Sequence, residues 1–267
     1  MRVAAVQARA VAGDVEANVD AAAGWVAAAA AAGATLAVLP ELYLPGYDPA
    51  TLRARPDDCD VTPDDPRLGP LAAAARAGDV AVVVGASLRA GGRRLLGLLG
   101  VGRDGQVSAL YSKQHLWDEE RALFSPGDGG ATAEVDGWPC GLGVCYDGCF
   151  PEHARAAADD GALAYVCPSA YVVGSEHRRD VYYAARALDN AIYVVMAGLV
   201  GRCGSCDFSG GTAVYDPQGR PVARVEEDEG IALADLDRRL IDEARAINPY
   251  TRDRRASLGS RAVVSLG

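Results

Sequence analysis

The chain has 267 residues, half of them hydrophobic, and a formal net charge of −10. A chain of this length can bury a sizeable core in one domain or two, and its acidic balance excludes nucleic-acid binding, which depends on clustered Lys and Arg facing phosphates. Seven irregularly spaced cysteines, in a chain large enough to fold without cross-links, predict free thiols in a reducing cytoplasm rather than a disulfide framework.

The N-terminal part is predicted to open with a β-α-β unit. Residues 2–8 and 34–39 have the pattern of strands, and residues 15–33 between them have the pattern of a helix. The first residues lack the basic patch, apolar stretch and cleavage site of a signal peptide. Glycines interrupt the alanine-rich helix before it reaches the roughly eighteen apolar residues of a membrane span. We therefore expect neither a targeting segment nor a membrane partner.

The rest of the chain is predicted to mix hairpins with β-α units. Because several of the strands are apolar on both faces, this order predicts layered α/β packing around more than one sheet surface. Strands are expected at 80–88, 95–101, 107–111, 141–145, 162–167, 191–197, 212–216, 221–226 and 230–235, and helices at 71–77, 151–160, 178–190 and 238–246.

Three polar side chains follow predicted strands. Glu41 comes after TLAVLP, Lys113 after VSALYS and Cys145 after GLGV. Loops at strand ends are where a rigid scaffold presents catalytic groups. Each residue alone also fits an ordinary role, as a solvated acid, a surface cation or a packed thiol. Only the three together indicate a reaction site.

Lys113 is distinguished by a count. All but one of the 26 Lys and Arg residues are arginine, and Lys113 is the sole lysine. A position that departs from this usage indicates a need for what arginine lacks, namely a compact ammonium with three rotatable donors.

The three groups fit one acyl-transfer mechanism. A cysteine that attacks a carbonyl carbon needs a base, donors for the oxyanion and an acid for the leaving amine. Glu41 is the candidate base, with Lys113 and the backbone N–H of Tyr146 as oxyanion donors. The ammonium and a helix start at 149–152 are expected to favour the thiolate of Cys145. His115, two residues past Lys113, is an alternative partner for the thiol.

Three sequence blocks carry a resemblance to a known family. LPELYLPGY, YSKQHLWDEERALFSPGD and GLGVCYDGCFPEHAR together resemble the nitrilase superfamily of carbon-nitrogen hydrolases, and later blocks extend the resemblance over nearly the whole chain. It implies a single domain over 1–267 with a four-layer αββα sandwich, two mixed sheets flanked by helices, and a thioester acyl-enzyme without cofactor or metal. It also implies a homodimer or higher homo-oligomer, with the tail at 256–267 a candidate for the interface.

The resemblance also assigns roles. Glu41 becomes general base and acid, Lys113 the oxyanion stabiliser and Cys145 the nucleophile. Glu120 matches a fourth family glutamate that positions substrate or lysine, although Glu119 beside it leaves the register open by one residue.

The substrate is predicted to be a small linear carboxamide. Carboxylate-handling relatives often carry an arginine a few residues beyond the cysteine, and residues 146–150 contain none. Tyr47, Asp147 and Glu176 are the expected substrate contacts, and the two acids favour a neutral or cationic tail. Arg178 and Arg179 are an alternative site for an anion.

Other activities remain open from the sequence. The same nucleophile serves an N-carbamoyl amine hydrolase, which releases carbon dioxide as well as ammonia, or a nitrilase. A thiol redox or binding protein is the alternative from another class, because Cys203 and Cys206 have the spacing of a redox or zinc pair. No second pair or histidine lies at metal-ligand spacing from them, so we do not expect a metal there.

Overall fold

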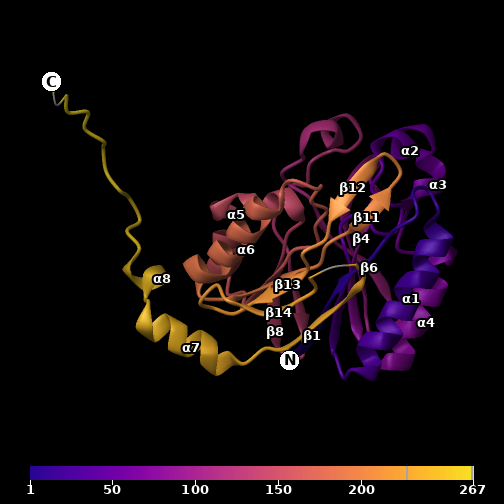
Figure 1. The fold of residues 1–267 in the computed structure, drawn as a ribbon, viewed down its shortest axis with the longest axis horizontal. Helices are drawn as coiled ribbons and strands as arrows, with labels where there is room; N and C mark the ends of the chain where they lie inside the picture. Colours follow the sequence, from indigo (N-terminus) through magenta and orange to yellow (C-terminus); the bar gives the residue numbers. More distant parts are fainter. Residues whose placement is uncertain (227, 266) are drawn as a thin grey trace.

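The computed structural model describes residues 1–226, 228–265 and 267. Two sheets pack face to face between two layers of helices (Figure 1). The outer layers are α1 (Val15–Ala31) and α4 (Gly69–Gly78) on one sheet, and α5 (Pro151–Asp159) and α6 (Glu176–Asn190) on the other. The expected αββα sandwich is confirmed.

The first sheet has seven strands. They are β1 (Arg2–Gln7), β2 (Leu36–Val38), β3 (Asp60–Val61), β4 (Ala81–Ala90), β5 (Arg93–Val101), β6 (Val107–Ser112) and β15 (Gly230–Asp235). Their order is β15-β1-β2-β4-β5-β6, with β3 paired to β4. The sheet is mixed, because β1, β2 and β4 run parallel while β15, β5 and β6 pair antiparallel to their neighbours.

The second sheet has six strands in the order β14-β13-β10-β9-β8-β7. They are β7 (Thr132–Val135), β8 (Trp138–Leu142), β9 (Ala164–Val166), β10 (Tyr193–Met196), β13 (Ala213–Tyr215) and β14 (Pro221–Arg224). A separate hairpin joins β11 (Val200–Cys203) to β12 (Cys206–Ser209). Figure 1 shows this hairpin at the end of the sandwich that also carries α2 (Pro49–Ala54) and α3 (Pro56–Cys59).

The side chains of the central strands of the second sheet point alternately into two different hydrophobic cores, one on each face of the sheet. Tyr193 and Val195 of β10 join the core shared with the first sheet, whereas Val194 and Met196 join the core under α5 and α6. Successive side chains of a strand point to opposite faces, so a strand that is buried on both faces is apolar throughout. This is why the continuous apolar runs predicted two covered faces.

The remaining helical elements are short or C-terminal. They are the 3₁₀ turns η1 (Pro66–Leu68), η2 (Asp118–Ala122) and η3 (Cys145–Cys149), and the helices α7 (Arg238–Ile247) and α8 (Tyr250–Asp253). Within the described ranges, no helix combines the length and apolarity needed to cross a bilayer.

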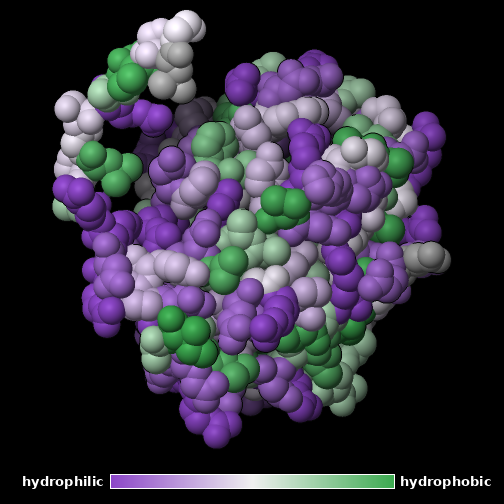
Figure 2. Space-filling view, turned by 60° about the vertical axis from the view of Figure 1, so that its left-hand side comes forward, coloured by the Kyte–Doolittle hydropathy of each residue, from purple (hydrophilic) through white to green (hydrophobic). Residues whose placement is uncertain are grey.

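The chain leaves the sandwich after α7. Figure 1 shows α8 and the residues beyond it projecting from the body, and Figure 2 shows apolar side chains on this projection. Leu258, Val263 and Val264 are 86%, 100% and 75% exposed. Such exposure of large apolar side chains is uncommon on a surface that contacts only water.

The element predictions differ from the structure mainly at three places. The strand expected at 141–145 lies at 138–142. The start of this strand was missed because it contains Pro139, and proline normally argues against a strand. The hairpin of β11 and β12 was not predicted because its sequence is polar and glycine-rich, and the strand β7 was not predicted because it is four residues long and follows a glycine-rich stretch.

Candidate active site

Glu41, Lys113 and Cys145 come together at one end of the sandwich. Lys113 directly follows β6, and Glu41 lies in the loop after β2. Lys113 donates hydrogen bonds of 2.7 Å from Nζ to Oε1 of Glu41 and to Oε1 of Glu120. All three side chains of this ion cluster are almost completely buried, at 1%, 0% and 3% exposure of Lys113, Glu41 and Glu120.

Burial and the neighbouring charges change the pKa values of Glu41 and Lys113. Burial raises the pKa of Glu41 to about 7, and the ammonium of Lys113 only partly offsets this. Burial lowers the pKa of Lys113, but Glu41 and Glu120 together raise it above its ordinary value. Lys113 therefore stays charged, while Glu41 can hold or release a proton near neutral pH.

One oxygen of Glu41 is left without a partner. Oε1 accepts from Lys113, whereas Oε2 is buried and has no hydrogen bond from any residue that the structure describes. The thiol of Cys145 is among the groups that act on the pKa of this carboxyl. A buried free carboxylate oxygen near a thiol is placed to take the thiol proton.

Cys145 begins η3 in a left-handed conformation, with φ of 43°. A non-glycine residue in this region stores strain, which is frequent at functional sites. Its backbone is held from both sides, because its N–H donates to Pro168 O at 2.9 Å and its carbonyl accepts from the Tyr183 hydroxyl at 3.3 Å. The turn thus presents the thiol to the cavity in a fixed direction.

The surroundings of the Cys145 thiol favour its protonated form. Burial and the charge of Glu41 raise the pKa of Cys145 well above its ordinary value, and Lys113 opposes them only in part. Lys113 acts on the thiol in the expected direction, towards the thiolate, but it does not outweigh burial and Glu41. A protonated thiol needs a nearby proton acceptor before it can attack a carbonyl carbon.

Gly85 of β4 sets the position of Glu41. Its N–H donates to Pro40 O at 3.0 Å and its carbonyl accepts from Leu44 N at 3.1 Å. A Cβ at Gly85 would lie 2.3 Å from Pro40 O and 2.6 Å from the Cα of Glu41. Only glycine lets the loop pack so closely on the strand.

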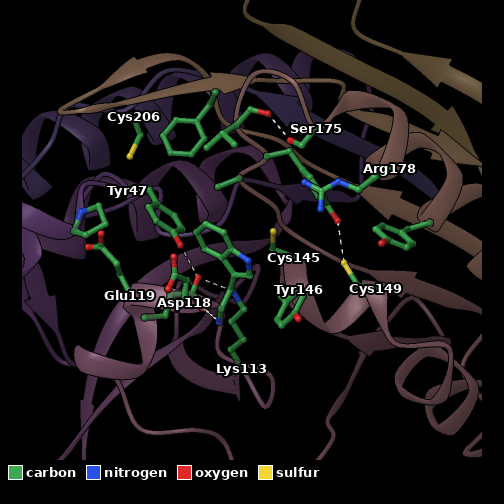
Figure 3. A pocket seen from close by; sticks show the side chains of 18 residues that line it. Tyr47, Lys113, Asp118, Glu119, Cys145, Tyr146, Cys149, Ser175, Arg178 and Cys206 are labelled. Carbon is green, nitrogen blue, oxygen red and sulfur yellow. Dashed lines mark hydrogen bonds and ion pairs between the residues drawn. The ribbon is translucent and has the colours of Figure 1, made fainter.

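A cavity of about 330 Å³ opens over these groups. Figure 3 shows Tyr47, Asp118, Glu119 and Lys113 on one side, Ser175, Arg178 and Cys149 on the other, and Cys145 between them. The lining is largely apolar or aromatic and comprises Tyr47, Pro49, Lys113, Trp117, Asp118, Glu119, Glu120, Cys145, Tyr146, Cys149, Ala170, Tyr171, Val172, Ser175, Arg178, Tyr182, Cys206 and Phe208. A cavity of this kind suits a small ligand with few polar groups.

Comparison with known proteins places this site in a family. The family model described as carbon-nitrogen hydrolase matches residues 2–246. The chain belongs to the carbon-nitrogen hydrolase family. The nitrilase-superfamily resemblance is thereby confirmed, and the protein is a hydrolase of carbon-nitrogen bonds.

Individual relatives of this carbon-nitrogen hydrolase are similar over most of their length. An (R)-stereoselective amidase of Pseudomonas sp. is 35% identical over 84% of this chain and 80% of its own. A Pseudomonas protegens protein named hydrolase in pqqF 5′ region is 34% identical over 84% and 79%. A solved amidase from Nesterenkonia sp. AN1, with the acetamide moiety of fluoroacetamide added covalently at the active-site cysteine, gives a TM-score of 0.84 at 31% identity, covering 96% of this chain and 94% of that one.

The structure of the hydrolase distinguishes Glu120 from Glu119. Glu120 is buried, contacts Lys113 and accepts from the Tyr47 hydroxyl at 2.6 Å and from Trp117 N at 2.7 Å. Glu119 is exposed at the cavity rim, with its carboxylate 3.7 Å from the guanidinium of Arg53. Tyr47 therefore holds Glu120 as well as lining the cavity, and Tyr146 lines the cavity beside Cys145.

Two expected substrate contacts of the hydrolase lie elsewhere. Asp147 is fully buried and is absent from the cavity lining, because it accepts from the Tyr111 hydroxyl at 2.8 Å and from Val144 N at 3.1 Å and so anchors η3. Glu176 does not line the cavity either, because its carboxylate turns back to accept from Gly174 N at 3.1 Å. The prediction of a neutral or cationic substrate tail depended on these two acids, and neither lines the cavity.

His115 is directed to Asp147 rather than to the thiol. Its Nδ1 lies 2.8 Å from Oδ1 of Asp147, and the residue lines a second cavity instead of the catalytic one. His115, Asp147 and His153 bring ligand atoms within 4.8 Å of one another, an arrangement that can hold a metal. Both ring nitrogens of His153 already contact tyrosine hydroxyls at 2.9 Å, so this cluster also serves as a hydrogen-bonded anchor without an ion.

Several cavity residues of the hydrolase escaped the sequence analysis. Phe208 and Cys206 reach the cavity from the unpredicted hairpin, where Cys203 and Cys206 are register partners and both are free thiols. Tyr182, which was also missed, lies four residues after Arg178 on α6, and both line the cavity, as that helical spacing allows. Of the two arginines named as an alternative anion site, Arg178 thus reaches the cavity, whereas Arg179 donates to Ser209 Oγ and Gly210 O.

Proposed function

We propose that the protein is an amidase that cleaves a small linear carboxamide to a carboxylic acid and ammonia through Cys145. The observation that carries this proposal is the sole lysine held between two buried carboxylates at the floor of a cavity that also exposes a thiol. The amidase names of the relatives, and the covalent acetamide moiety at the active-site cysteine of the Nesterenkonia amidase, support it.

The positions of these side chains support the following acylation step. Oε2 of Glu41 takes the thiol proton while the sulfur of Cys145 attacks the amide carbon. An ammonium has three N–H donors, and Lys113 spends two of them on carboxylates, so the third is free for the oxyanion. The N–H of Tyr146 is the second donor, because the first turn of η3 leaves its leading amides without helical acceptors.

Glu41 then returns its proton to the amide nitrogen, the carbon-nitrogen bond breaks and ammonia leaves a thioester on Cys145. In the second half, Glu41 takes a proton from water as the water oxygen attacks the thioester carbon, and the sulfur leaves with that proton. The acid is released and the thiol and carboxylate are restored. Glu120 and Tyr47 take no proton in these steps but hold Lys113 in place.

The test measures products and the enzyme intermediate together. Wild-type protein is incubated with primary amides, ureido compounds and nitriles, and ammonia and carbon dioxide are quantified. Intact-protein mass spectrometry then searches for an acyl adduct on Cys145. Ammonia alone from amides with an acyl adduct supports the amidase, carbon dioxide with ammonia identifies a carbamoyl hydrolase, and turnover of nitriles identifies a nitrilase. Ligand binding without any turnover would identify the thiol binding protein.

We also propose that residues 1–267 form one domain that assembles as a homodimer in a reducing compartment such as the cytoplasm. The exposed apolar side chains of the projecting tail and of α7, such as Leu258 and Ile247, support an interface with a second copy. The seven free cysteines support the compartment. Sedimentation of the full chain and of a chain ending at residue 255 tests the assembly: loss of the dimer on truncation is expected, and a monomeric full chain would contradict it.

A further inference from the structure

Two of the three histidines of the chain lie beside a buried aspartate, outside the catalytic cavity. His115, Asp147 and His153 each bring one ligand atom within 4.8 Å of the others. Nδ1 of His115 lies 2.8 Å, and Nε2 of His153 lies 3.9 Å, from Oδ1 of Asp147. Ligand atoms around a tetrahedral zinc ion lie about 3.4 Å apart, since each is about 2.1 Å from the metal. Small movements therefore place all three atoms at bonding distance from one ion.

The cluster is open to a second cavity, which has a volume of about 390 Å³. His115 and His153 line this cavity, and the side chain of Asp147 is fully buried. Glu152 and Asp160, at the two ends of α5, line the cavity as well, whereas none of its lining residues within the described ranges is Lys or Arg. The carboxylates attract a cation to this cavity, and the open space admits water as a fourth ligand.

Two existing hydrogen bonds give way when an ion binds. Nδ1 of His115 releases Asp147 and faces the metal, with the ring proton on Nε2. Nε2 of His153 releases the Tyr111 hydroxyl, 2.9 Å away, while Nδ1–H of the same ring donates to the Tyr165 hydroxyl, also 2.9 Å away. Asp147 stays in place, because its Oδ2 still accepts from the Tyr111 hydroxyl at 2.8 Å. A metal-binding histidine commonly donates its other ring N–H to such an outer partner.

We propose that His115, Asp147 and His153 bind one Zn²⁺ ion, with water from the second cavity as the fourth ligand. Two imidazole nitrogens and a carboxylate oxygen suit Zn²⁺, whereas Mg²⁺ and Ca²⁺ take oxygen ligands. His115 lies two residues after Lys113, and Asp147 lies two residues after Cys145. The ion has a structural role, because it ties the segment after β6 to the turn η3 and takes no part in the proposed reaction. The inference goes beyond the amidase function and does not depend on it.

The test adds Zn²⁺ or Co²⁺ to the full chain after treatment with EDTA. Calorimetric titration with Zn²⁺ gives the Kd and the stoichiometry, thermal unfolding gives the stabilisation, and the absorption spectrum with Co²⁺ reports the ligand atoms. His115→Asn removes the imidazole and keeps an N–H donor for Asp147. The matched control is His177→Ala, which removes the remaining histidine, an exposed one on α6. A double variant, Cys203→Ser with Cys206→Ser, removes the thiol pair that has metal-binding spacing.

Wild type is expected to bind one Zn²⁺ per chain and to unfold at a higher temperature in its presence. His115→Asn should weaken binding by at least roughly 10- to 100-fold, the cost that loss of an outer hydrogen-bond partner alone already brings, and should lose most of the temperature shift. Co²⁺ should give the weak visible bands of nitrogen and oxygen ligands without a sulfur-to-cobalt charge-transfer band. His177→Ala and the double cysteine variant should match wild type.

Three results would overturn the site. They are a wild type that Zn²⁺ neither binds nor stabilises, Zn²⁺ binding that is unchanged in His115→Asn, and a sulfur-to-cobalt band from the single bound ion. Each measurement is made without substrate, so the outcome stays separate from the question of whether amides are hydrolysed.

Discussion

The buried carboxyl of Glu41 predicts how activity depends on pH. In the proposed mechanism Glu41 is the general base, which works only when it is unprotonated, and its pKa is raised to about 7. Activity is therefore present above pH 7 and lost as pH falls through it. With one ionisation, kcat/KM at pH 6 should be about a tenth of its plateau and at pH 5 about a hundredth, since each pH unit changes the unprotonated fraction tenfold. An ordinary glutamate would stay active to below pH 5.

Replacing Glu120 is expected to shift this pH dependence. Its negative charge is one of the causes that raise the pKa of Glu41. Glu120→Gln removes that charge and leaves Lys113 with Glu41 as its sole charged partner in the cluster, so the acid limb should move to lower pH even if the plateau falls. The control is Glu119→Gln, which removes an exposed rim charge paired with Arg53 and should leave the limb in place.

The assay is kcat/KM from ammonia release between pH 5 and 9 at constant ionic strength, because surface charges are screened by salt. The reasoning is refuted if the limb of Glu120→Gln moves upward, or if wild type shows no limb between pH 5 and 8. If kcat/KM kept rising up to pH 9, the nucleophile would be a thiolate that ionises independently of Glu41, which would also contradict the proposed role of Glu41. The raised pKa of the Cys145 thiol predicts no such rise.

The other predictions concern single side chains. Cys145→Ser should lower ammonia release by several orders of magnitude yet unfold near the wild-type temperature, whereas retained turnover would exclude Cys145 as nucleophile. Lys113→Met should lose activity and roughly 3–5 kcal/mol of stability in urea unfolding, because two buried carboxylates lose their cation, and Lys113→Arg, which keeps the charge but not the shape, should still lose most activity. Gly85→Ala should lower kcat by pushing on the Glu41 backbone, while Gly24→Ala, in open space on α1, should stabilise by roughly 0.5–1 kcal/mol; equal effects of the two would contradict the packing argument.

The fold was predictable because its pattern is strong. Strands that are buried on both faces have continuous apolar runs, and β10 (Tyr193–Met196), which is buried throughout, lies within the predicted 191–197. The hairpin of β11 and β12 was missed because its residues are polar and glycine-rich and pack over a cavity rather than inside a core. The conformation of such a segment depends on the residues that pack against it, and these cannot be read from the local sequence.

The site was partly predictable for a similar reason. Glu41, Lys113 and Cys145 follow strands, and strand ends meet at one edge of a sheet. The direction of a loop side chain is not set by its place in the sequence, which is why Asp147, two residues from Cys145, turns inward to hold η3 instead of facing substrate. Arg178 was weighed only as an alternative, because whether an exposed arginine faces water or a cavity depends on what packs opposite it.

The hairpin and α6 line the cavity without supplying the three reacting groups. In the proposed mechanism, the reacting groups and much of the surface around the acyl chain therefore belong to separate stretches of the polypeptide. Replacing Cys206 or Tyr182 should change the shape of the cavity without touching Glu41, Lys113 or Glu120, whereas Phe208 packs on Tyr47, which holds Glu120. Such a division lets descendants of one hydrolase diverge toward new metabolites by changing a few positions on two peripheral elements. It also marks those positions as the place to begin when redesigning this scaffold.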